Sequence, residues 1–295
     1  MNDTPHSEAP RIDPPLSAAQ VTAYLDRIGI ARPDRLDLDY LRRLQRRHLH
    51  TVPFENLSIH LGEDIPLETD ALFEKIVTRR RGGYCYEVNG ALAALLRSLG
   101  YRVSLLAARV HGPSGFGALS HLALRVDLDE PWLVDVGFGR NPELPLRLDD
   151  RGEQHDVRGV FRIEDADAGD LDVYRDGSVL YRIEQRPREL DDFKAVHWYQ
   201  RTWPGSHFAQ TPFCTLFSDQ GIITLAGRRL ITTEAATRHE EELQSDEQVL
   251  AAYLKHFGLA LDRVPAPPSQ GTFTPFGTAN AGTRGDSSKG SKPRT

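Results

Sequence analysis

The stretch "RRRGGYCYEVNG", Arg79 to Gly90, separates two helical patterns and places a cysteine at their boundary. The preceding run, residues 69–80, has apolar residues at helical spacing, and the two glycines stop it. A new helical pattern begins near Cys85 and continues to Gly100. We therefore expect Cys85 in the first turn of a helix, where unpaired backbone N–H groups favour an anion such as a thiolate.

Two more helical patterns precede this boundary, so the N-terminal part reads as a helical bundle. In the first, Ser17 is placed to cap the helix, Gln20 completes a capping box, and Gly29 ends the apolar face. The second covers residues 36–50 and carries arginines on its polar faces. We assign residues 17–104 to the bundle, with a flexible leader over residues 1–16.

After residue 101 the apolar period changes from that of a helix to that of a strand. Several short strands separated by Gly, Asp or Pro predict a central antiparallel β-barrel over residues 105–209. Strand patterns and a final helix capped by Ser245 predict an α/β lid over residues 210–264. Residues 265–295 are rich in Pro, Gly, Ser and Thr, which predicts a disordered tail. The expected fold class is α+β.

The composition narrows the class of protein. The 295 residues carry a formal net charge of −6, which gives no general attraction to nucleic acid or to an anionic membrane. We see no signal-peptide pattern and no apolar run long enough to cross a bilayer, so a cytoplasmic location is expected. Two cysteines in that compartment are expected to stay reduced. We expect no metal site.

A thiol that acts as a nucleophile needs a nearby base to take its proton. Two further residues are candidates, one for this base and one for the group that orients it. His121 opens one strand pattern, and Asp135 lies near the end of the next. If a turn at residues 129–131 joins these strands in a hairpin, the two side chains share one face. Asp135 can then orient the His121 ring beside the Cys85 thiolate, as in nucleophile–base–carboxylate triads.

Three other residues are assigned to the interior of the protein. Glu55 stands between apolar residues, and a buried carboxylate needs a partner. Arg81 is the candidate, because the pair would hold the Cys85 loop against the bundle. Cys214, within an apolar strand pattern, is expected to fill core space.

Taken together, these segments resemble the arylamine N-acetyltransferases. The resemblance rests on "VPFENLSIH" (Val52 to His60), "RRGGYCYEVNG" (Arg80 to Gly90), His121 ahead of a strand, and "VDVGFG" (Val134 to Gly139). A weaker match continues in "WYQRTWPGSHF" (Trp198 to Phe208). The family's fold combines a helical bundle, a β-barrel and an α/β lid around a cysteine-protease-like core, which agrees with the division above.

The resemblance also implies an activity and a set of ligand contacts. It implies acetyl transfer from acetyl-CoA to arylamines, arylhydrazines or hydroxylamines by a ping-pong mechanism, with no permanently bound cofactor and in a monomer or homodimer. The catalytic residues would be Cys85, His121 and Asp135. Expected contacts to CoA are Gly137, Phe138, Gly139, Tyr199 and Gly205, and expected contacts to the acceptor are Phe54, Tyr84, Ser120, Phe138 and Phe208.

Other functions share the same order of Cys, His and Asp. A papain-like or transglutaminase-like enzyme would attack a peptide or glutamine carbonyl, and an amide synthase of ansamycin-type biosynthesis would take a polyketide chain as donor. A non-enzymatic binding module with an incidental thiol would require Cys85 to be unreactive.

Overall fold

The computed structural model describes residues 15–113, 115–234 and 237–267. Residues 1–14 of the predicted leader and residues 268–295 of the predicted tail lie outside these ranges. The α-helices are α1 (Ala18–Ile28), α2 (Leu38–Leu49), α3 (Leu57–Leu61), α4 (Thr69–Phe73), α5 (Cys85–Leu99), α6 (Lys194–Thr202), α7 (His207–Gln210) and α8 (Asp246–Phe257). The strands are β1 (Phe54–Glu55), β2 (Arg102–Gly112), β3 (Gly115–Phe116), β4 (His121–Asp127), β5 (Pro131–Val134), β6 (Leu146–Arg147), β7 (Gln154–Asp156), β8 (Gly159–Asp165), β9 (Leu171–Arg175), β10 (Ser178–Arg188), β11 (Phe213–Phe217), β12 (Gly221–Ala226), β13 (Arg229–Glu234) and β14 (Thr237–Glu242).

Helix α5 is the centre of the helical part. It contacts α1 and α4 on one side and strands β2 and β4 on the other, so nearly its whole surface is buried. The helix ends predicted from the sequence are present: Ser17 and Gln20 form a capping box at α1, and Gly100 ends α5 in the left-handed conformation. The run predicted as one helix at residues 69–80 is α4 followed by a π-helical turn at Glu74–Thr78.

The central sheet is antiparallel and nearly closes on itself. Within the described residues it has nine strands in the order β6-β5-β4-β2-β10-β9-β8-β7, with β3 paired to β2. Its two edge strands are joined through one side chain: the Arg147 N–H donates to Gln154 Oε1 at 2.7 Å, and Gln154 Nε2 donates to the Arg147 carbonyl at 2.9 Å. Apolar residues of this sheet form a core of their own, separate from the core around helix α5. The predicted α+β fold class is confirmed.

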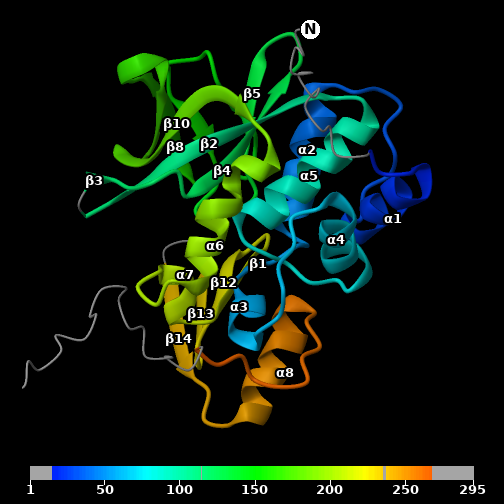
Figure 1. Ribbon diagram of the computed structural model, residues 1–295, viewed down its shortest axis with the longest axis vertical. Helices are drawn as coiled ribbons and strands as arrows, with labels where there is room; N and C mark the ends of the chain where they lie inside the picture. The colour runs from blue at the N-terminus through cyan, green and yellow to red at the C-terminus, as the bar shows by residue number, and fades with distance from the viewer. Residues whose placement is uncertain (1–14, 114, 235–236, 268–295) are drawn as a thin grey trace, which may run out of the picture.

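The third part of the fold is a smaller sheet with the order β1-β11-β12-β13-β14, and helix α8 packs against β11 and β12. Strand β1 comes from the N-terminal part of the chain, so this sheet pairs an N-terminal segment with strands from the C-terminal part. Figure 1 shows the small sheet and α8 at the opposite end of the molecule from the large sheet, with α6 and α7 between them. The predicted domain boundaries remain predictions. Helices α6 and α7 and strand β14 were not predicted.

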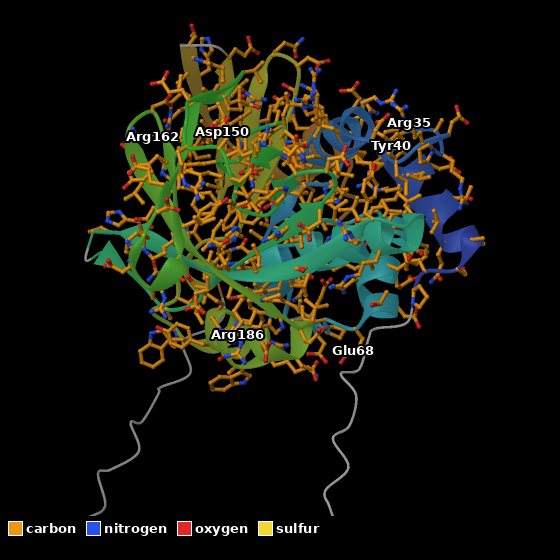
Figure 2. All side chains as sticks on the ribbon, turned by 90° about the horizontal axis from the view of Figure 1, so that it is seen from above. Arg35, Tyr40, Glu68, Asp150, Arg162 and Arg186 are labelled. Carbon is orange, nitrogen blue, oxygen red and sulfur yellow. The ribbon has the colours of Figure 1, made fainter. Side chains whose placement is uncertain are left out.

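Seen from above, the helices and the large sheet lie side by side (Figure 2). Asp150 and Arg162 mark the sheet side, and Arg35 and Tyr40 mark the helical side. No described helix is long and apolar enough to cross a membrane.

The predicted pair of Glu55 and Arg81 is present and holds the Cys85 loop. Arg81 Nε donates to Glu55 Oε1 at 3.1 Å, the Glu55 side chain is 0% exposed, and Glu55 also accepts from the Leu57 N–H. Burial, the largest influence, raises the pKa of Glu55, but the charges of Arg81 and Lys75 together with hydrogen bonds outweigh it and leave the pKa lowered. The carboxylate is therefore charged inside the core.

Candidate active site

The loop before Cys85 contains two glycines, Gly82 and Gly83, and neither position has space for a side chain. A Cβ on Gly82 would lie 1.9 Å from the Pro53 carbonyl oxygen, and a Cβ on Gly83 would lie 2.7 Å from Glu87. The glycines do not open space for a substrate, because that space is filled by the protein's own atoms. The glycines allow close packing, and Cys85 follows as the first residue of α5.

Cys85, His121 and Asp135 lie together in a buried row. His121 Nε2 is 2.7 Å from Asp135 Oδ2, and the ring also hydrogen-bonds the Cys85 thiol, which leaves Nδ1 for the sulfur. Leu124 pairs with Val134 in the hairpin of β4 and β5, so residues 121 and 135 share a face one rung apart, as predicted. Each of the three side chains is at most 2% exposed.

The groups around His121 favour its imidazolium form. Burial opposes the charged form of His121, but the charge and hydrogen bond of Asp135, together with Cys85, raise its pKa to about 10. Burial also opposes the Asp135 carboxylate, yet His121, Asn89 and the Gly137 N–H keep its pKa below the usual value. At neutral pH, His121 is therefore protonated and places a positive charge beside Cys85.

Two residues that the sequence analysis missed hold Asp135 in place. Asn89 Nδ2 donates to Asp135 Oδ1 at 3.0 Å and to the Leu122 carbonyl at 2.6 Å, and the Tyr181 hydroxyl donates to Asp135 Oδ2 at 3.1 Å. Asn89 lies four residues after Cys85 and so on the same face of α5, a spacing that could have identified it. Tyr181 comes from β10, and no local pattern points to it.

The backbone N–H groups of the loop after Asp135 already have hydrogen-bond partners within the protein. The Gly137 N–H donates to Asp135 Oδ1 at 2.9 Å, and the N–H groups of Phe138 and Gly139 donate to Asn141 Oδ1 at 3.1 and 2.8 Å. These donors are occupied, so the loop cannot form an anion-binding nest. Gly137 is needed for packing instead, since a Cβ there would lie 2.6 Å from the Cys85 Cα.

A cleft of about 900 Å³ opens onto the thiol, a size typical of small-molecule sites. Most of the predicted ligand-contact residues line it: Phe54, Ser120, Gly137, Phe138, Tyr199, Gly205 and Phe208, together with Cys85 and His121. Gly139 does not line it and packs near Phe54 with a φ of +78°. No group of three or more metal-binding side chains occurs in the described parts of the chain.

Tyr84 does not line the cleft, so its assignment as an acceptor contact is corrected. Its side chain is 0% exposed, and its hydroxyl lies 2.5 Å from His197 Nδ1 on α6. The other nitrogen of His197 lies 2.8 Å from the Ile65 carbonyl, which only an N–H can satisfy. Tyr84 therefore ties the start of α5 to α6 through a neutral histidine.

Two buried histidines, His48 and His197, are neutral in the folded protein, so we expect the protein to lose stability in mild acid. Burial lowers the pKa of His197 to about 4 and that of His48 to about 3, whereas an unfolded chain protonates both near pH 6.5. Between those values only the unfolded state gains protons, so the free energy of unfolding falls as pH falls. We expect each histidine to contribute a loss of about 2 kcal/mol between pH 7 and pH 5.

Urea unfolding at the two pH values measures this loss. In His197→Gln, the amide can accept from Tyr84 and donate to Ile65 without titrating, so the pH-dependent loss should shrink by the contribution of one histidine. His155→Gln, at a surface position, should leave the loss unchanged. Equal slopes in all three proteins would contradict the assignment of His197.

Comparisons with known proteins agree with this architecture. Residues 37–265 match the sequence profile of a family described as N-acetyltransferase. An arylamine N-acetyltransferase of Mycolicibacterium smegmatis is 35% identical over 256 residues, which cover 83% of this chain and 93% of that protein. The solved arylamine N-acetyltransferase of Salmonella typhimurium superposes with a TM-score of 0.78 at 28% identity and covers 83% of this chain and 93% of that one.

A further solved structure, the Mycobacterium marinum arylamine N-acetyltransferase in complex with CoA, has a TM-score of 0.76 at 33% identity and covers 81% of this chain and 93% of that chain. The fold and the sequence profile together define an N-acetyltransferase, a class of acyltransferase. The relatives specify it further: the chain belongs to the arylamine N-acetyltransferase family.

Proposed function

We propose that this protein transfers the acetyl group of acetyl-CoA to the nitrogen of an arylamine, arylhydrazine or hydroxylamine, through an acetyl-cysteine at Cys85. The observation that carries the proposal is the row of thiol, imidazole and carboxylate that ends at the floor of the cleft. Its support includes the CoA complex of the Mycobacterium marinum relative. The cytoplasmic location and the oligomeric state remain predictions.

The proposed reaction has two halves that share one proton carrier. The Cys85 thiolate attacks the thioester carbonyl, the carbon–sulfur bond to CoA breaks, and the departing CoA thiolate takes the proton of the His121 imidazolium. The amine then attacks the acetyl-cysteine, neutral His121 accepts the proton that the amine loses, and Cys85 leaves as a thiolate. The starting thiolate and imidazolium are restored.

Acetyl-CoA alone, without an acceptor, tests the first half. We expect intact-mass measurement to show one acetyl group on the chain, release of one equivalent of CoA, and loss of the adduct when aniline is added. The adduct should be absent in Cys85→Ala and present in Cys214→Ala, whose thiol is buried in the core of the small sheet. CoA release only after the amine is added would contradict the two-step mechanism.

A further inference from the structure

Asn56 is a buried residue whose side chain does not make the bond that its place in the fold suggests. It stands at the N-cap of α3, a position where an asparagine side chain normally accepts a hydrogen bond from the first turn of the helix. The structure has no such bond, and the Leu57 N–H of this turn donates to the Glu55 carboxylate. With Asn56 only 1% exposed, its amide must be bonded elsewhere in the protein.

The amide of Asn56 holds one short segment from the far part of the chain. Its Nδ2 donates to the carbonyls of Phe208 and Thr211 at 2.8 and 2.9 Å, and its Oδ1 accepts from the Phe213 N–H at 2.7 Å. His60 Nε2 lies 3.0 Å from the same Phe208 carbonyl. A helix leaves its last four carbonyls without a partner in the helix, and α7 has only four residues. Asn56 therefore supplies partners that the segment from α7 to β11 lacks.

This segment carries part of the aromatic lining of the cleft. Phe208 and Phe213 line the cleft, and so does Phe54, two residues before Asn56. The Phe54 ring lies 6.5 Å from that of Phe208 and 5.4 Å from that of Phe213, and those two rings are 5.9 Å apart. We call these three residues the aromatic wall. Its N-terminal and C-terminal members are joined by the short pairing of β1 with β11 and by the side chain of Asn56.

Resting on the proposed transfer to an arylamine, we propose that Asn56 is a positioning residue for the acceptor. By fixing the aromatic wall, it sets where the ring of the acceptor packs while the nitrogen attacks the acetyl-cysteine. A shift of about 1 Å in a reacting group can slow a reaction by roughly 10²-fold, so a residue that touches no substrate can control the rate. The hydrogen bonds of the Asn56 amide go to the α7–β11 segment and not to the row of thiol, imidazole and carboxylate.

Two acceptors test this role. Aniline has a ring that packs on the aromatic wall, whereas hydrazine offers an attacking nitrogen without a ring. Cys85 is acetylated with acetyl-CoA, the excess donor is removed, and loss of the acetyl group is followed by rapid quench and intact mass at several acceptor concentrations. In Asn56→Ala, the second-order rate constant with aniline should fall roughly 10- to 100-fold. With hydrazine it should stay within about threefold of the wild-type value, because the reacting groups of the protein keep their places.

Two further variants separate positioning from a general loss of stability. Asn56→Ser keeps a hydroxyl that can donate to one of the two carbonyls, so it is the milder change and should lower the aniline rate constant by a smaller factor. Leu230→Ala removes a side chain from the core of the small sheet, outside the cleft. It should leave the ratio of the aniline and hydrazine rate constants at the wild-type value.

The ratio of the two rate constants decides the outcome. Equal losses with both acceptors in the Asn56 variants would overturn the proposal in favour of a purely structural role, and so would a ratio that falls as far in Leu230→Ala. A wild-type ratio in both Asn56 variants would show that the aromatic wall holds without this amide. A wild-type chain that acetyl-CoA does not acetylate would instead remove the proposed function itself.

Discussion

Replacing Asp135 with Asn will slow single-turnover acetylation of Cys85 by acetyl-CoA by roughly 10²–10⁴-fold, the range for lost acid–base function. The amide keeps the size of the carboxylate but presents an NH₂ group where Asp135 Oδ2 now meets His121 Nε2 at 2.7 Å. Nε2 must then accept a hydrogen bond, so the proton of the neutral ring moves to the nitrogen that faces Cys85. Such a ring cannot take the thiol proton.

The same substitution lowers the charge that holds the imidazolium, so the pH profile should change as well. With Asp135 the pKa of His121 is raised to about 10, and without the carboxylate charge burial will lower it. We expect acetylation in Asp135→Asn to increase with pH across the neutral range, where wild type is flat. Asp129→Asn, an exposed aspartate in the same hairpin turn, is the charge-matched control and should react like wild type. A near-native rate in Asp135→Asn would remove this carboxylate from the mechanism.

Replacing Arg81 with Met will lower the free energy of unfolding by about 3–5 kcal/mol, because the Glu55 carboxylate stays buried without its partner. Chemical denaturation at pH 7 measures the loss. Arg79→Met removes an exposed arginine two residues away and should change stability by no more than about 0.5 kcal/mol. The double variant Glu55→Gln with Arg81→Met should recover part of the loss, since residue 55 no longer carries a buried charge without its partner.

The stability loss in Arg81→Met should also grow with pH. In wild type the lowered pKa of Glu55 means that its pair with Arg81 stabilises the fold above the pKa of the unfolded carboxyl and is lost in acid. In the variant, the largest charge that opposes the effect of burial is gone, so the pKa of this carboxyl rises and the folded state loses stability as pH rises. The difference from wild type should therefore be larger at pH 8 than at pH 5. Unchanged stability with much weaker CoA binding would show that Arg81 meets the donor instead.

Local patterns were sufficient for the parts of the site that depend on neighbouring residues. Helix α5 begins at Cys85 because a glycine pair interrupts the preceding helical pattern. His121 and Asp135 meet because a short hairpin sets which residues share a face, a relation that strand period and turn residues determine. The pairing of Glu55 with Arg81 followed from the cost of a buried carboxylate.

Contacts between segments far apart in the chain could not be predicted from any local sequence pattern. The Tyr181 hydroxyl reaches Asp135 across 46 residues, and β1 pairs with a strand from the far part of the chain. Tyr84, an aromatic residue next to Cys85, was predicted to contact the acceptor but is buried against α6. The N–H groups of residues 137–139 donate to Asp135 and Asn141. Only the packed structure shows which polar groups are already bonded and which face the cleft.

The sequence by itself determined the change from helices to strands after residue 101, the choice of Cys85, His121 and Asp135 as candidates, and the meeting of His121 with Asp135 in the hairpin. These depend on backbone period, turn residues and charge burial, which act over a few residues. The tertiary structure decided that Asn89 and Tyr181 hold Asp135 and that the N–H groups of the loop after it are already bonded within the protein. Those contacts depend on how whole elements pack, because side chains far apart in the chain meet only after the core has set the distances between them.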